Sequence, residues 1–232
     1  MILVTDWAKG DTSGSFVIVT RPSYQPGDLF LLHIGSPADV SVDSMPIGWS
    51  LLKQYKRSGL SSFLFAKIAG PSEPTSYTFY FNGSGYLYYR IIGFRGINNS
   101  QPIISITDYS GSGSPISLNK ISLQQGTIVV AVCGHTSDVQ MQSSDQWKLV
   151  VSAYYGDIFY QYFAGAPETE NPIVFTNTDP NVNWNFWLIE LNDATPYLDG
   201  ELFTTWLTTD EPGSKLWVKI NGEWKPAKIT II

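Results

Sequence analysis

The chain has 232 residues, of which 43% are hydrophobic, 14% aromatic and only 15% charged. Charged residues average about 25% in globular proteins, so Ser, Thr, Asn, Gln and Gly must cover much of the surface. The formal net charge of −6 argues against nucleic-acid binding and against adhesion to anionic lipid, which both need basic surfaces.

Short apolar and aromatic runs predict strands along most of the chain. The first is an edge strand at 16–19, which follows a predicted turn at 9–14 within an N-terminal arm of residues 1–20. Further strands are expected at 28–34, 61–68, 77–81, 87–94, 127–133, 147–151, 158–163 and 184–191. One helical turn is expected near 39–45. No long segment keeps a 3.6-residue apolar period, so we predict a nearly all-β protein.

An internal repeat relates the two halves of the chain. In order, 25–35, 48–52, 63–73, 76–79 and 87–94 resemble 124–134, 146–150, 158–168, 172–175 and 183–190. At equivalent positions, Trp49 and Trp147 are predicted to be core residues. Two units stacked face to face would bury their apolar faces. We therefore predict one jelly-roll-like β-sandwich over residues 21–196, with halves of about 21–107 and 116–196 and a flexible joint at 108–115.

The C-terminal segment, residues 197–232, contains a hairpin pattern. A strand is expected at 216–220, and Asn221-Gly222 is a strong two-residue turn signal before a second strand that starts at 223. A two-stranded hairpin is marginally stable alone. We expect this hairpin to pack on the sandwich or on a neighbouring subunit.

Four motifs in the first half together resemble the pattern of a known family. They are Ser23-Tyr-Gln-Pro-Gly-Asp-Leu-Phe-Leu31, Pro46-Ile-Gly-Trp49, Ser76-Tyr-Thr-Phe79 and Ile92-Gly-Phe-Arg-Gly-Ile97. Over roughly residues 20–195 the chain resembles a β-sandwich module of tailed-bacteriophage virion proteins. The C-terminal Leu216-Trp-Val-Lys-Ile-Asn-Gly-Glu-Trp-Lys-Pro-Ala227 resembles a short hairpin found near the ends of phage tail and appendage proteins.

The resemblance implies a non-enzymatic structural or adhesive component of a virion, in the tail, the fibre or the capsid decoration. Such a component would be made in the host cytoplasm, consistent with the lack of a secretory signal at the N-terminus. Its expected partners are other virion proteins, further copies of itself in a trimer, and a host-surface glycan. No apolar run is long enough to span a bilayer, so membrane insertion is not expected. Nucleic-acid binding is not expected because the net charge is −6.

Residues that could carry catalysis or hold a metal are few. His33 and His135 do not align in the repeat, and they are interpreted as satisfied or surface histidines rather than as a metal pair. Cys133, the single cysteine, lies in an apolar run and is interpreted as a buried structural thiol. We predict no catalytic, cofactor-binding or metal-binding residues and no cofactor.

Loop carboxylates leave two further hypotheses. A hydrolase on a jelly-roll scaffold would need paired carboxyls, for which the candidates are Glu168, Glu170, Asp157, Asp138 and Asp145. The Asp- and Asn-rich loop at 178–183 could hold calcium. Solvated carboxylates and Asx turns explain the same residues without either function.

Aromatic residues are the strongest binding signal in the sequence. The candidates for an interface or for glycan contact are Tyr86, Tyr88, Tyr155, Trp217 and Trp224. Tyr and Trp are enriched wherever one side chain needs an apolar face and a polar tip. The alternative to a virion building block is therefore a carbohydrate-binding module or lectin-like adhesin.

Overall fold

The computed structural model describes residues 2–118, 128–137, 140–143, 147–162, 173–194, 216–220 and 223–227. The chain divides into two compact units, Met1–Ala194 and Thr195–Ile232. The described residues form strands, turns and bends, which confirms the all-β prediction. None of them forms an apolar helix that could cross a membrane.

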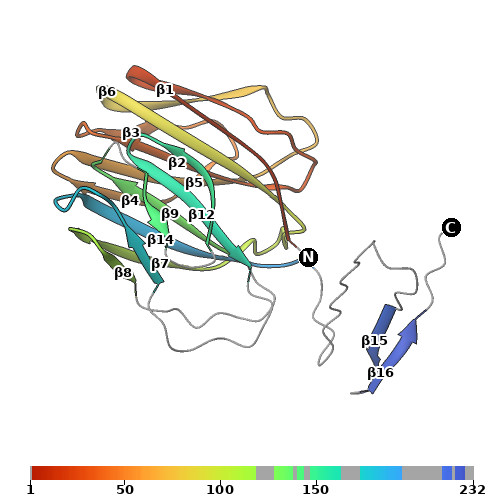
Figure 1. Ribbon diagram of the computed structural model, residues 1–232. Coiled ribbons are helices and arrows are strands. Elements are labelled where there is room, and N and C mark those ends of the chain that lie inside the picture. Colours follow the sequence, from red (N-terminus) through yellow and green to blue (C-terminus); the bar gives the residue numbers. More distant parts are fainter. Residues whose placement is uncertain are drawn as a thin grey trace. The chain divides into compact units, whose positions relative to one another are not determined.

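Two large antiparallel sheets form the centre of the first unit (Figure 1). The first sheet has the order β1 (Leu3–Thr20), β6 (Ser76–Arg95), β2 (Leu29–Ser36), β5 (Leu60–Ile68), β4 (Ser50–Arg57). The second has the order β7 (Ile103–Ser112), β14 (Asn183–Leu191), β9 (Ile128–His135), β12 (Gly156–Tyr162), β11 (Lys148–Ala153). Strands β2 and β9 thus take the central place in their sheets.

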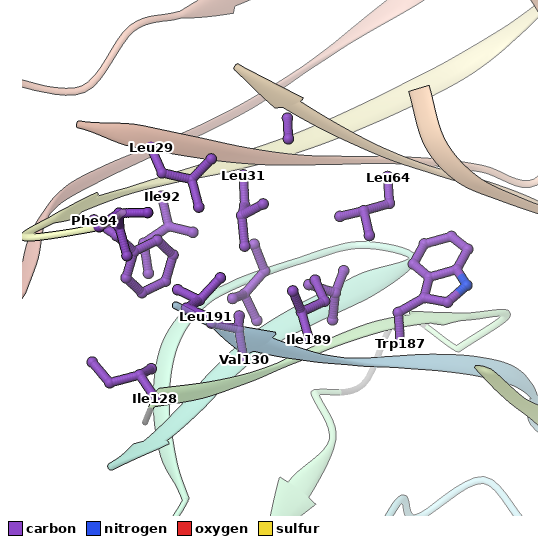
Figure 2. Packing of buried hydrophobic residues seen from close by; sticks show 14 of the residues in the cluster. Leu29, Leu31, Leu64, Ile92, Phe94, Ile128, Val130, Trp187, Ile189 and Leu191 are labelled. Carbon is purple, nitrogen blue, oxygen red and sulfur yellow. The ribbon is translucent and has the colours of Figure 1, made fainter. Parts of the chain in front are cut away.

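The two sheets pack face to face around a shared hydrophobic core (Figure 2). From the first sheet come Leu29, Leu31, Leu64, Ile92 and Phe94, and from the second come Ile128, Val130, Trp187, Ile189 and Leu191. Each of these side chains is almost completely buried. Full burial of one such side chain contributes roughly 1.5–3 kcal/mol, so this core is a main source of stability for the unit.

A smaller layer covers the opposite face of each sheet. Beyond the first sheet, β3 (Ser41–Ser44) pairs with the outer part of β6, where β1 also pairs, and Trp49 lies in the core beneath them. Beyond the second, β10 (Gln142–Ser143), β13 (Ile173–Thr176) and β8 (Ile116–Leu118) form a three-stranded sheet over Trp147. Both tryptophans are buried, as predicted.

The single core expected between two stacked halves is thus one of three cores. Strands β2 and β9 are buried at every position, so both of their faces contact apolar side chains. Their sequences are continuous apolar runs rather than alternating ones, which is the pattern of a strand covered on both sides. An alternating strand would need only one covering layer.

Three local predictions were wrong. Residues 39–45 contain strand β3 and no helical turn; Val40 is buried there, as alternation in a strand allows. The expected turn at 9–14 is part of β1, paired with residues 85–90 of β6. The expected flexible joint begins in β7, where residues 108–112 pair with 183–187 of β14. In each case, backbone pairing to a long neighbouring strand outweighs a turn-like composition.

The four sequence motifs of the first half contact one another in pairs. Asp28 of the Pro-Gly-Asp motif is buried and accepts two hydrogen bonds from Arg95, from Nε at 3.0 Å and from Nη2 at 2.9 Å. The Trp49 ring packs edge-on against Tyr77 and Phe79, at centroid distances of 5.2 and 5.3 Å. Each contact joins two of the four motifs, so their joint occurrence has a structural reason.

In the second unit, β15 (Leu216–Ile220) and β16 (Glu223–Ala227) pair antiparallel. The register places Leu216 opposite Ala227 and Ile220 opposite Glu223. The predicted contact residues Trp217 and Trp224 belong to these strands, and their side chains lie outside the described part of the structure.

Candidate functional site

Three of the predicted contact residues meet in one aromatic cluster. Tyr86 and Tyr88 lie on β6, and Tyr155 lies in the turn between β11 and β12. The Tyr88 ring stacks on Tyr86 and Tyr155 at centroid distances of 6.2 and 5.3 Å, and it contacts Tyr154 at 5.6 Å. Tyr86 and Tyr154 are each 55% exposed, so the cluster presents ring surface to solvent.

A cavity of about 400 Å³ lies beside this cluster. We name it the tyrosine pocket; its main lining residues are Lys9, Asp11, Tyr88, Gln140, Ser152 and Tyr154. They come from β1, from β6, from the segment before β10 and from the β11–β12 hairpin. Its size is at the lower end of the range of about 300–1,000 Å³ for small-molecule sites.

The polar groups of the tyrosine pocket have both signs of charge. The Lys9 ammonium donates a 2.8 Å hydrogen bond to the Ser152 carbonyl and ties β1 to β11. Asp11 is the register partner of Tyr88. Burial, together with Tyr155 and Asp11, raises the pKa of Tyr88, so its phenol keeps its proton and can donate a hydrogen bond.

The turn that carries Tyr154 and Tyr155 has an unusual backbone. Tyr155 has φ of 63°, and every other positive φ in the described residues belongs to glycine. The β4–β5 hairpin has a turn of the same length, in which Gly59 with φ of 76° takes the second position. A left-handed conformation costs an L-residue roughly 1–2 kcal/mol, and such strain clusters at functional sites.

We expect Tyr155→Gly to be more stable than Tyr155→Val by about 1–2 kcal/mol, because valine tolerates the left-handed region least. Both substitutions remove the ring that stacks on Tyr88, so the comparison isolates the backbone. Urea unfolding of the two variants measures the difference. Equal midpoints and slopes would show that the turn relaxes to negative φ without cost.

Behind the tyrosine pocket lies a buried arginine. Arg90 is fully buried; its Nη2 donates to the Tyr154 carbonyl at 2.6 Å, and its Nη1 donates to Nδ1 of His33. Arginine cannot accept a hydrogen bond, so His33 accepts at Nδ1 and carries its proton on Nε2. That Nε2 donates to the Ser62 hydroxyl at 2.7 Å. The network links the turn of the pocket, which belongs to the second sheet, to β6, β2 and β5 in the interior of the first sheet.

Electrostatics fix the protonation states in this network. Burial lowers the pKa of Arg90 to about 10, so the guanidinium stays charged at neutral pH. Burial, then the charge of Arg90 and then His135 hold the pKa of His33 well below its usual value of 6.5. His33 is therefore neutral, which agrees with the hydrogen-bond pattern.

His135 and Asp157 form a second buried pair. His135 donates from Nδ1 to the Ser137 carbonyl at 2.9 Å, and its Nε2 lies 3.1 Å from Oδ2 of Asp157. The same oxygen accepts from the Met141 amide at 2.8 Å. Asp157 is fully buried, so its interpretation as a solvated loop carboxylate was wrong. Both histidines are satisfied by protein groups.

The remaining candidates are a single cysteine, one loop rich in Asp and Asn, and four further carboxylates. Cys133 is fully buried, as predicted, and burial raises the pKa of its thiol well above the usual value. In the 178–183 loop, the Asp179 side chain accepts from the Asn181 amide at 2.9 Å, which is an Asx turn. Asp138, Asp145, Glu168 and Glu170 lie outside the described residues.

Sequence reasoning did not select Lys9, Asp11 or Gln140 as site residues. The first two were assigned to a turn, and the signal that could have corrected this is the alternation 7–13, in which Trp7, Lys9, Asp11 and Ser13 share one face of a strand. Comparison of the chain with protein-family models, with curated proteins and with solved structures found no match. Functional inference therefore depends on the residues themselves.

Proposed function

We propose that this chain is a non-enzymatic structural component of a tailed-bacteriophage virion, acting in assembly and in attachment to the host surface. The observation that carries the proposal is the set of four motifs that resembles the virion β-sandwich module. Contacts within the fold join these motifs: the buried Asp28 pairs with the partly exposed Arg95, and Trp49 packs on Tyr77 and Phe79 in the core. The shared motifs therefore support a shared architecture.

An exposed apolar patch supports the assembly part of the proposal. Phe16, Ile18 and Tyr80 are 41%, 53% and 48% exposed, and the Phe16 and Tyr80 rings lie 6.1 Å apart. They lie on paired residues of β1 and β6, where Phe16 is opposite Tyr80. Apolar and aromatic side chains gathered on a surface are typical of protein–protein contacts. The low charge of the chain lowers the desolvation cost of such contacts.

Purified particles provide the direct test. We expect mass spectrometry of gradient-purified virions from the encoding genome to find this chain at a constant stoichiometry to the other structural proteins. Immunogold labelling should place it on the tail, the fibre or the capsid, and cross-linking should report its oligomeric state. A replication enzyme of the same genome serves as the control for contamination. Absence of the chain from particles that contain the known structural proteins would refute the proposal.

A further inference from the structure

We propose that the tyrosine pocket binds a short neutral saccharide. This inference rests on the attachment part of the proposed function and names the ligand class of one site. The pocket combines the half-buried ring of Tyr88 and the exposed ring of Tyr154 with the Asp11 carboxylate and the Gln140 amide. A sugar ring has apolar C–H faces bordered by hydroxyl groups, so it needs both kinds of contact at once.

The arrangement of hydrogen-bonding groups favours a polyol. A carboxylate accepts only, an ammonium donates only, and an amide or phenol does both. Sugar hydroxyls can donate and accept, so they can satisfy Asp11, Lys9 and Gln140 together. The rings of Tyr154 and Tyr88, 5.6 Å apart and tilted by 57°, can contact the C–H face of such a ligand beside these polar groups.

The charges of the tyrosine pocket select a neutral ligand. Lys9 and Asp11 lie two residues apart on β1 and both line the cavity. An anionic group that approached Lys9 would also meet the Asp11 carboxylate, and a cation would meet Lys9. Both side chains are exposed, so solvent screens their charges in part. A ligand in contact with them still meets a like charge on one side, and a ligand without formal charge avoids both penalties.

The pocket is also preorganised. Arg90 holds the Tyr154 carbonyl from inside the molecule at 2.6 Å, and Lys9 holds the Ser152 carbonyl at 2.8 Å. Packing between Gly35 and Tyr155 leaves the turn little freedom, since a Cβ on Gly35 would lie 2.6 Å from the Tyr155 carbonyl oxygen. A fixed turn loses little conformational entropy on binding.

The corresponding crossing at the opposite sheet edges is bridged by charged side chains. There Lys53 forms an ion pair with Asp108, which joins β4 to β7, and Arg57 donates to the Gly111 carbonyl at 3.2 Å. Its hairpin turn carries Gly59 at the position of Tyr155. The exposed Tyr154, by contrast, lies at the crossing that contains the tyrosine pocket.

The test is a glycan array that contains neutral and acidic saccharides, probed with the full chain, followed by calorimetry on each saccharide that binds. We expect neutral saccharides to bind, and we expect Tyr154→Ala to weaken binding by about tenfold or more, the scale of a lost aromatic stacking contact. Asp11→Asn, which keeps the shape but not the charge, should weaken it several-fold. Tyr80→Ala is the matched control, because Tyr80 is similarly exposed and lies outside the pocket.

Three outcomes would overturn the inference: no binding to any neutral saccharide, binding to acidic saccharides alone, or equal loss in Tyr154→Ala and Tyr80→Ala. Thermal melting of each variant shows whether it is folded. If the chain is present on particles but binds no saccharide, only the pocket assignment fails. If the chain binds a neutral saccharide but is absent from particles, the virion role fails and the saccharide site remains.

Discussion

Gly156→Ala is expected to lower the free energy of unfolding by about 3 kcal/mol, the upper end for overpacking a core. A Cβ at this position would press against Nη1 of Arg90 and the Cys133 carbonyl oxygen, and it would lie 2.6 Å from Cε1 of His33. Contacts below 3.0 Å are essentially never observed for Cβ atoms. The carbonyl belongs to the central strand β9, so it cannot move without disturbing the ladder with β12.

The Gly156 substitution would also break the hydrogen bond between Arg90 and His33. Arg90 and His33 would have to separate, and a buried charged group that loses a hydrogen bond leaves both partners unsatisfied. For a chain of this length we expect the melting temperature to fall by about 6–12 °C. Differential scanning calorimetry measures the melting temperature, and urea unfolding measures the free energy of unfolding.

Gly70→Ala is the matched control for Gly156→Ala. Its Cβ would meet only Oε1 of Glu73, at 3.3 Å, so this carboxylate, which Lys67 and Tyr77 also hold, has to shift by only a few tenths of an ångström. We expect a change below about 1 kcal/mol, the usual scale for a substitution away from the core. Equal losses at the two glycines would mean that the sheets can separate near Gly156 at little cost.

The sequence could predict the strands that carry their own apolar signal. The runs 29–34 and 128–133 are apolar at almost every position, and they became the central strands β2 and β9. It could not predict β3, the first half of β1 or the end of β7. These segments are rich in Ser, Gly, Thr and Asp. They form strands because their backbones pair with β6 or β14. Their pairing is a tertiary effect that overrides local propensity.

In the candidate site too, the residue types could be predicted from the sequence, but their contacts could not. Tyr86, Tyr88 and Tyr155 could be selected because aromatic residues alternate along predicted strands. The contacts among these three rings depend on how the two sheets stack, because the stacking places the β11–β12 turn beside β6. No local sequence pattern predicts this stacking. Arg90 was the least predictable residue, because arginine is almost never fully buried. Only the structure shows that it joins the turn to His33.

Acid is expected to destabilise the first unit through His33. The folded pKa of His33 lies well below 6.5, whereas in the unfolded chain it is about 6.5. Below pH 6.5, His33 therefore binds a proton in the unfolded state and remains neutral in the folded state. The stabilisation due to neutral His33 is complete above pH 6.5, and it decreases as the pH falls below that value. For one such group the slope is at most about 1.4 kcal/mol per pH unit.

His33→Gln isolates this contribution. A Gln side chain can accept from Arg90 and donate to Ser62, but it does not titrate. We expect the stability of the wild-type protein to fall more steeply between pH 6.5 and pH 4.5 than that of the variant, by about 1 kcal/mol per pH unit. Urea unfolding at several pH values measures both slopes, and carboxylates common to both proteins cancel in the difference. Parallel curves would mean that His33 becomes protonated within the fold, and that Arg90 then moves away from it.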